Sequence, residues 1–189
     1  GKVLEFAGTA RDYWGNANNL MLMRDHFIRI LDYIDGKTSV QLDLPPNTIQ
    51  VLDPTNYGVA LLGFNPQSQA SFAASYLGMV DTYVNSIAHA PGVTPEVIQQ
   101  VGDIKAAVRN VRNLLEMVQK DVRRLESMTD KQLLLPSTQF LLDDMQTEAF
   151  YAFVGQLDPS TNKVRPDVTQ IHYDIEQLAT FNITPYSSS

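Results

Sequence analysis

The chain has 189 residues, no cysteine and a formal net charge of −7, with 14 basic and 21 acidic residues. The lack of cysteine excludes disulfides, thiolate metal sites and cysteine nucleophiles together. Because nucleic acids and anionic membranes bind clustered Lys and Arg, the acidic balance disfavours both as partners. No apolar run approaches the roughly 20 residues that a membrane-spanning helix needs. A chain of this length accommodates one domain with a substantial core.

The first predicted helix covers residues 9–35 and stops at Gly36. Thr9 is expected to be its N-cap, with Asp12 three residues later as a weak capping box. Apolar residues recur at helical spacing along this segment, and Arg24 interrupts them. The apolar stripe consists of Tyr13, Ala17, Leu20, Phe27, Leu31 and Ile34.

Residues 37–67 are expected to form a non-helical insert. Apolar and polar residues alternate in SVQLDL and again in TIQV, on either side of the turn sequence PPN. This pattern predicts a small β-hairpin and loop at about 38–64. A non-helical insert of such length is uncommon in a compact domain and is often an interaction element. We expect an interaction surface where the insert meets the start of the first helix, and its candidate residues are Trp14, Leu42, Leu44, Tyr57 and Phe64.

A second helix is predicted to begin at Asn65-Pro66 and to end at Pro91-Gly92, because Asn is a good N-cap and Pro suits the first helical turn. Its expected apolar row is Phe72, Tyr76, Val80, Tyr83 and Ile87.

The longest helical pattern begins at Thr94-Pro95-Glu96 and continues to residue 128. Its nine apolar positions follow steps of four and three without a break, and they are Val97, Val101, Ile104, Val108, Val111, Leu115, Val118, Val122 and Leu125. Seven of the nine are Val or Ile, and the flanking positions do not carry the opposite charges of a two-stranded coiled coil. The row therefore predicts the central helix of an antiparallel bundle within one chain, in preference to a zipper with a second chain.

Two more helices are expected at 137–158 and 167–180, with a polar loop between them and a disordered tail at about 183–189. These helices contain seven acidic residues and no Lys or Arg, whereas the long helix carries six bases, so we expect the acidic helices to flank its basic face. The core row of the first of them is Leu142, Met145, Ala149, Phe153 and Leu157. The predicted fold is thus mainly α: one domain over 1–189, an antiparallel bundle of four to five helices with a small hairpin insert.

Sequence motifs typical of catalytic, phosphate-binding or metal-binding sites are missing. The sequence contains no phosphate-binding glycine loop and no serine-hydrolase elbow. Its three histidines, His26, His89 and His172, are not arranged as Glu-x-x-His pairs, so a di-iron site is not expected. Asp143, Asp144 and Glu148 are interpreted as a solvated acidic surface. We therefore expect no catalytic residue, no cofactor and no metal, and a protein that is not an enzyme.

Aromatic residues exceed what a small core needs, and the sequence Phe150-Tyr151-Ala152-Phe153 cannot bury every ring on one face of a helix. Exposed aromatic clusters usually mark interfaces. We expect a structural or protein-interaction domain of a larger assembly, in a bacterial envelope, a secretion apparatus or a virion. The alternative is a helical bundle that binds a small apolar ligand or lipid. The amide-rich composition, the missing cysteines and a start without Met favour a processed, periplasmic or secreted protein over a cytoplasmic one.

Overall fold

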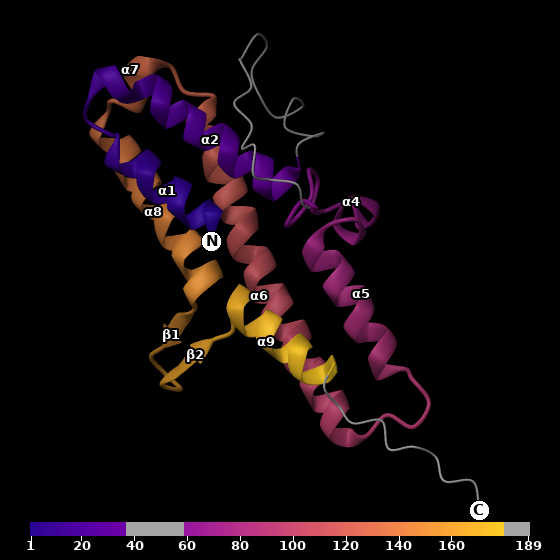
Figure 1. Cartoon of the computed structure of the whole chain (residues 1–189). Helices are drawn as coiled ribbons and strands as arrows, with labels where there is room; N and C mark the ends of the chain where they lie inside the picture. Colours follow the sequence, from indigo (N-terminus) through magenta and orange to yellow (C-terminus); the bar gives the residue numbers. More distant parts are fainter. Residues whose placement is uncertain (37–58, 180–189) are drawn as a thin grey trace, which may run out of the picture.

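The computed structural model describes residues 1–36 and 59–179, and it is mainly helical with one small antiparallel sheet (Figure 1). The predicted class, a helical bundle with a small hairpin, is confirmed. In chain order the elements are α1 (Lys2–Asp12), η1 (Ala17–Asn19), α2 (Leu20–Asp35), α4 (Gln69–Ala73), α5 (Tyr76–Ala88), α6 (Pro95–Glu126), α7 (Asp130–Leu133), α8 (Pro136–Val154), β1 (Gln156–Asp158), β2 (Lys163–Arg165) and α9 (Val168–Ala179).

The prediction of a single helix over residues 9–35 is wrong, because the chain turns back between α1 and α2. Gly15 adopts a φ of +88°, and the Asn16 side chain accepts a hydrogen bond from the main-chain N–H of Asn18 at 3.0 Å. Such a local cap offers the backbone an alternative to a continuing helix. Thr9, the expected N-cap, lies inside α1, where its Oγ1 donates to the main-chain oxygen of Glu5 at 2.9 Å.

The helix predicted after Asn65 is likewise divided, into α4 and α5. Ser75 begins α5, since its Oγ accepts a hydrogen bond from the main-chain N–H of Gly78 at 3.2 Å. A side chain at Gly78 would overlap the main-chain oxygen of Phe72, so glycine permits the close approach of the two helices. Tyr83, expected in the apolar row, is exposed instead, and the buried positions of α5 include Leu77, Val80 and Val84.

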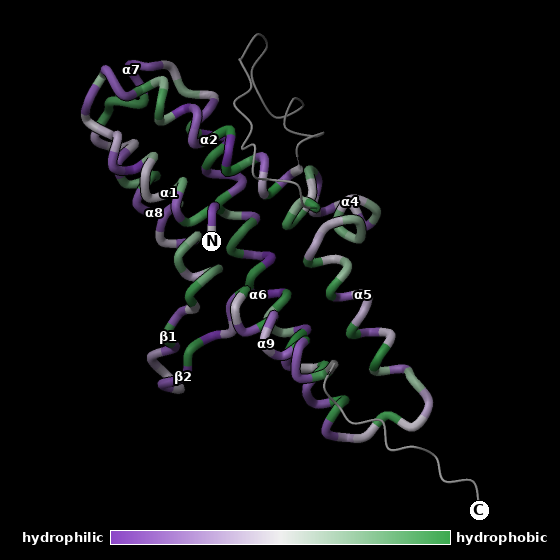
Figure 2. The backbone as a smooth tube through the Cα atoms, viewed as in Figure 1, coloured by the Kyte–Doolittle hydropathy of each residue, from purple (hydrophilic) through white to green (hydrophobic). Residues whose placement is uncertain are grey.

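The long helix α6 forms the centre of the bundle, as predicted. The Thr94 side chain accepts a hydrogen bond from the main-chain N–H of Val97 at 3.4 Å, and Pro95 occupies the first turn. Every predicted apolar position except Val97, which is half-buried, is buried. Hydrophobic and hydrophilic residues alternate along this helix in Figure 2, as a helix with one core-facing side requires.

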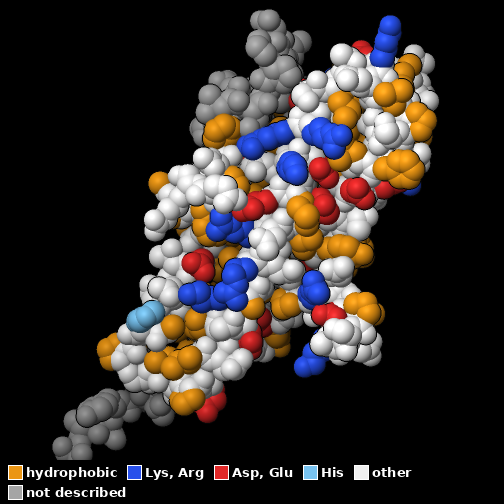
Figure 3. Space-filling view, turned by 180° about the vertical axis from the view of Figure 1, so that it is seen from behind, with side chains coloured by type: hydrophobic (Ala, Val, Ile, Leu, Met, Phe, Trp, Pro, Cys, Tyr) orange, Lys and Arg blue, Asp and Glu red, His pale blue; other side chains and the backbone are white. Residues whose placement is uncertain are grey.

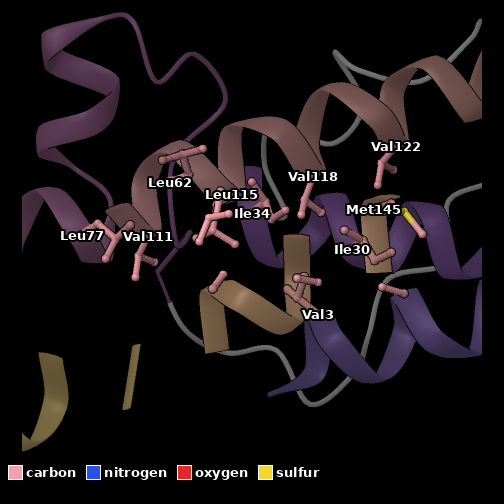
Figure 4. Close-up of a cluster of buried hydrophobic side chains, with 14 of the residues drawn as sticks. Val3, Ile30, Ile34, Leu62, Leu77, Val111, Leu115, Val118, Val122 and Met145 are labelled. Atoms are coloured by element: carbon pink, nitrogen blue, oxygen red, sulfur yellow. The ribbon is translucent and has the colours of Figure 1, made fainter. Parts of the chain in front are cut away.

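Different helices of the same chain cover the two halves of α6. Its N-terminal half packs against α5 and α9, and its C-terminal half packs against α2 and α8, with α1 lying on α2 and α8 (Figure 1). In Figure 4, Val118 and Val122 of α6 lie beside Ile30 of α2 and Met145 of α8. The apolar row is therefore buried within the chain.

The helix predicted to reach residue 158 ends four residues earlier, at Val154. Gly155 follows with a φ of +90°, and a Cβ there would lie 2.9 Å from the main-chain oxygen of Arg165. Glycine thus lets β2 come close. Strands β1 and β2 pair antiparallel, with Leu157 opposite Val164, in a segment that was predicted as helix end and polar loop.

The hairpin predicted at about 38–64 falls mostly on residues 37–58, which lie outside the described part of the chain. Residues 59–64, which are described, form no strand. The predicted tail at about 183–189 also lies outside the described residues.

The acidic helices α8 and α9 do pack against α6, but arginines of α6 take other partners. Arg123 pairs with Asp35 of α2 at 3.3 Å, and Arg112 pairs with Glu116 within α6 at 2.8 Å. On α8, Asp143 is bound by an arginine of α1 at 2.7 Å. Arg112, Arg123 and Asp143 therefore do not form the ion pairs that we expected between α6 and the acidic helices.

Arg24, which interrupts the apolar stripe of α2, binds the C-terminal end of α6. Its Nη1 donates to the main-chain oxygen of Glu126 at 3.1 Å, and its Nη2 donates to the main-chain oxygen of Met128 at 2.6 Å and to Asp130 at 2.9 Å. The last carbonyls of a helix have no partner within it, and a cation there is favourable. Arg24 thus ties α2 to the point where α6 ends.

We expect Arg24→Gln to lower the free energy of unfolding by about 2–3 kcal/mol, because hydrogen bonds from a charged donor to three acceptors are lost. Urea denaturation at pH 7 measures the change. Arg124→Gln is the matched control, since Arg124 is exposed on α6, and it should alter the free energy by no more than about 0.5 kcal/mol. Equal effects of the two changes would contradict this role for Arg24.

Candidate functional site

The two predicted interaction residues that the structure describes, Trp14 and Phe64, lie apart. Trp14 packs against the core, and its Nε1 donates to the main-chain oxygen of Leu133 at 3.0 Å. Phe64 is half-buried near the other end of α2, with the Arg123 guanidinium 5.3 Å from its ring centre. Since α2 has 16 residues, it separates them by roughly 24 Å. The remaining candidates, Leu42, Leu44 and Tyr57, lie outside the described residues.

Residues 60–63, which we call the stem, are hydrogen-bonded to both the end of α2 and the start of α5. The main-chain N–H groups of Leu61 and Leu62 donate to the main-chain oxygens of Tyr33 and Ile34, at 2.9 and 3.0 Å. The main-chain oxygens of residues 60 and 61 in turn accept from the first N–H groups of α5 at 2.8 and 3.2 Å. The stem thereby satisfies backbone groups that both helix ends leave without partners.

Side chains of α6 hold the chain at the end of the stem. Gln119 Nε2 donates to the main-chain oxygen of Gly63 at 3.3 Å and also to the Asp35 carboxylate. Arg123 Nη2 donates to the main-chain oxygen of Phe64 at 2.9 Å and to Asp35 at 3.3 Å. Asp35 and Gln119 are both buried, so this polar network lies inside the protein, where hydrogen bonds are stronger than in water.

A second set of contacts holds residues 65–67. Arg112 Nη2 donates to the main-chain oxygen of Pro66 at 2.5 Å, and its guanidinium lies 4.2 Å from the ring centre of Phe72. Glu116 accepts from Arg112 Nε at 2.8 Å and from the side chain of Gln67 at 3.2 Å. This loop is therefore fixed on α6 at several points.

Between this loop and α6 lies a groove of about 470 Å³, which we call the α6 groove. Two of the charged residues that line it, Arg123 and Glu116, already form the ion pairs described above. Lys120 forms none within the part of the chain that the structure describes, and it is exposed. The groove is also lined by Asn65, Pro66, Gln67, Asn113 and Met117.

A second candidate site is an exposed apolar surface. The outer side of α8 and the hairpin expose large apolar side chains, and we call this area the α8–hairpin surface. Its residues and exposed fractions are Phe140 71%, Phe150 45%, Val154 49%, Leu157 56% and Val164 59%. The core side of α8 is formed by other residues, Leu142, Met145, Ala149 and Ala152. An amphipathic surface helix has one apolar face, whereas α8 has apolar residues on both its core side and its solvent side.

Three carboxyl groups gather between α6 and α8. Burial, and then the neighbouring Asp121 and Asp144, raise the pKa of Glu148 to about 7, although Lys120 opposes the shift. Burial and Asp144 likewise raise the pKa of Asp121. The Oε2 atom of Glu148 is buried without a hydrogen-bond partner. The interpretation of Asp143, Asp144 and Glu148 as fully solvated surface is therefore wrong for Glu148.

The histidines occupy unrelated positions. His26, the first of the three, lies with its ring stacked between Phe6 and Tyr13, at centre distances of 5.5 and 5.6 Å, and burial lowers its pKa. His89 follows the last turn of α5, and His172 pairs with a glutamate one turn further along α9. Among the residues that the structure describes, no three His, Cys, Asp or Glu side chains are placed so that they could hold a metal ion.

No protein-family model, curated protein or solved structure matches this chain. In the described segments, 1–36 and 59–179, no helix is long and apolar enough to cross a lipid bilayer.

We expect the stability of the protein to fall as the pH rises from about 5 to 8, in part because of Glu148. Its folded-state pKa of about 7 exceeds the ordinary value of 4.5, so the folded state binds the proton more tightly. The resulting stabilisation is present below pH 4.5 and is lost as the pH passes 7. Since Glu148 is only partly buried, Glu148→Gln should stabilise the protein at pH 8 by about 1 kcal/mol.

Urea denaturation of both proteins between pH 5 and 8 measures this difference, which should shrink towards zero at pH 5. Asp103→Asn on the exposed side of α6 is the control, and its effect should not grow with pH in this way. A pH-independent gain from Glu148→Gln would show that Glu148 is not protonated in the folded protein.

Proposed function

We propose that this chain is a non-enzymatic protein-interaction domain of a larger assembly. The α8–hairpin surface supports the proposal, because it presents two phenylalanines and three aliphatic side chains to solvent. Large exposed apolar clusters on soluble proteins usually mark contact sites for other proteins. The amide-rich composition and the missing cysteines favour a bacterial envelope, a secretion apparatus or a virion as the setting, in the periplasm or outside the cell.

The arrangement of these side chains suits one continuous contact. Successive residues of an α-helix turn by about 100°, so Phe140, Phe150 and Val154 fall within one side of α8. From 140 to 154 this row is roughly 21 Å long. Leu157 and Val164, which are exposed and directly opposite each other, follow in the hairpin that begins where α8 ends. Buried aromatic residues contribute much of the binding energy at protein interfaces, which gives Phe140 and Phe150 the leading role.

The alternative, a module that binds a small apolar ligand or lipid, has less support. Sites for such ligands are enclosed and lined mainly by apolar and aromatic side chains. The α6 groove is lined largely by amide and charged side chains. The apolar residues of the α8–hairpin surface lie on the outside of the bundle instead, where they are accessible to a protein surface.

Site-specific photo-crosslinking in the cells that naturally produce the protein tests the proposal. A photoreactive phenylalanine analogue replaces Phe140, Phe150 or Leu157 in turn, and the adducts are identified by mass spectrometry. We expect the same partner protein from all three positions. We also expect at least about a fivefold weaker adduct at Phe150 when Leu157→Asp is added, because a charge buried in an apolar interface is unfavourable.

Gln99 on α6 and Ser86 on α5 are the control positions, since both are exposed and lie away from α8. If all five positions give the same adducts, or if the three apolar positions give none, the α8–hairpin surface is not a protein-binding surface.

A further inference from the structure

We propose that the junction of α2, α6 and α7 is a proton-operated switch, in which the Glu126 carboxyl and α7 compete for the Arg24 guanidinium. While Glu126 carries its proton, Arg24 holds α7 in place. When Glu126 is ionised, it draws Arg24 away and α7 is held less tightly. The residues of this junction are separate from the α8–hairpin surface, so the switch does not depend on the function proposed for that surface.

Glu126, the last residue of α6, is a buried carboxyl without a hydrogen bond. It is only 4% exposed, and among the residues that the structure describes its Oε2 atom has no hydrogen-bond partner. Its Oε1 atom lies 3.7 Å from Nη1 of Arg24, about 1 Å further than in a hydrogen bond between charged groups. A buried carboxylate without hydrogen bonds is unfavourable, so this arrangement suits the protonated carboxyl. Acidic side chains at the surface, such as those visible in Figure 3, are instead stabilised by water.

Glu126 changes its charge near neutral pH. Burial raises its pKa to about 7, Asp25 of α2 adds to the shift, and Arg24 opposes it. Because this pKa exceeds the ordinary value of 4.5, the folded protein keeps the proton until the pH passes 7. The charged residues that α7 and the start of α8 bring to the junction are Asp130 and Lys131, both exposed, and Asp143, which Arg11 of α1 binds.

Arg24 connects Glu126 to α7. Its Nη1 donates to the main-chain oxygen of Glu126 at 3.1 Å, whereas its Nη2 donates to the main-chain oxygen of Met128 at 2.6 Å and to Asp130 at 2.9 Å. An ionised carboxylate attracts a guanidinium strongly inside a protein. Because the guanidinium is a rigid planar fork, closing its 3.7 Å separation from Glu126 draws Nη2 away from Met128 and Asp130.

The position of α7 depends on such contacts because this helix has only four residues. Within it, the Leu133 N–H donates to the main-chain oxygen of Thr129 at 3.0 Å, and Thr129 and Gln132 form a capping box. A helix this short is not stable on its own. From outside, Arg24 holds its start, and Trp14 Nε1 donates to the main-chain oxygen of Leu133 at 3.0 Å. Since the chain has one tryptophan, the indole N–H reports directly on α7.

A titration of the isotope-labelled full chain from pH 6.5 to 8.5 tests the switch, with the Trp14 indole N–H signal as the NMR readout. We expect this signal to move to lower chemical shift with a midpoint near pH 7, because the hydrogen bond to Leu133 weakens. The hydrogen-exchange protection factor of the Leu133 amide should fall at least about fivefold, since one pKa unit of coupling changes an opening equilibrium about tenfold. Burial lowers the pKa of His26 from 6.5, so that group is mostly neutral over this range.

Glu126→Gln keeps the shape of the protonated carboxyl, so both responses near pH 7 should disappear in this variant. Glu148→Gln is the matched control, because the pKa of Glu148 is also raised to about 7, and it should keep both responses. Asp130→Asn changes an exposed side chain and weakens the hold of Arg24 on α7. Its Trp14 signal should therefore lie partway to the high-pH position already at pH 6.5.

Thermal melting checks that the three variants are folded. If Glu126→Gln does not fold, the titration of the unaltered chain and the Asp130→Asn variant still decide the outcome. The switch is ruled out if the unaltered chain shows no response near pH 7, if Glu126→Gln keeps the response, if Glu148→Gln loses it, or if Asp130→Asn leaves the Trp14 signal unchanged. None of these results bears on the crosslinks at α8, so the two proposals fail separately.

Discussion

The burial of one apolar row on α6 by helices of the same chain is the interaction on which the rest of the structure depends. Eight of its nine positions, from Val101 to Leu125, are buried, and each such side chain stabilises the fold by about 1.5–3 kcal/mol relative to exposure. At 32 residues α6 is too long for one neighbour of ordinary length to cover, so different helices bury its two halves. This division explains why α5 and α9 pack at one end of the bundle and why α1, α2 and α8 pack at the other.

Polar contacts then determine where the helices end and how the connecting segments lie. Arg24 binds the carbonyls at the end of α6, and the stem satisfies both the end of α2 and the start of α5. Gln119 and Arg123 fix the next residues of the chain on α6. Because buried polar groups without partners are costly, these contacts specify one arrangement of the loops rather than many. The groove is a consequence of that arrangement.

Much of the fold was predictable because α6 shows an unbroken row and a clear Thr-Pro start. The break between α1 and α2 was missed because the apolar stripe continues in register across it, although Gly15-Asn16 is a turn signal that could have shown it. The hairpin after α8 was missed because its strands have three residues each, too few for a reliable alternation. Gly155, Pro159 and Asn162 were the turn signals in that segment.

The candidate sites were less accessible from the sequence. The outward-facing rings of α8 were anticipated from the run that contains Phe150, but the exposure of Phe140 and of the hairpin depends on which side of α8 the core occupies. The α6 groove requires contacts between residues that are about 50 positions apart, such as Arg112 with Pro66 and Arg123 with Phe64. No local pattern indicates such pairs. The role of Arg24 could not be predicted either, because its partners at the end of α6 are about 100 positions away in the sequence.

The core of this protein is complete within one molecule, and amide hydrogen exchange tests this claim most directly. The exchange of peptides from α6 is followed by mass spectrometry as the protein is diluted about a hundredfold. We predict that residues 104–122 are among the best protected and that their protection does not change on dilution. Protection that falls as the protein is diluted would mean that a second molecule covers the apolar row, and it would contradict this account.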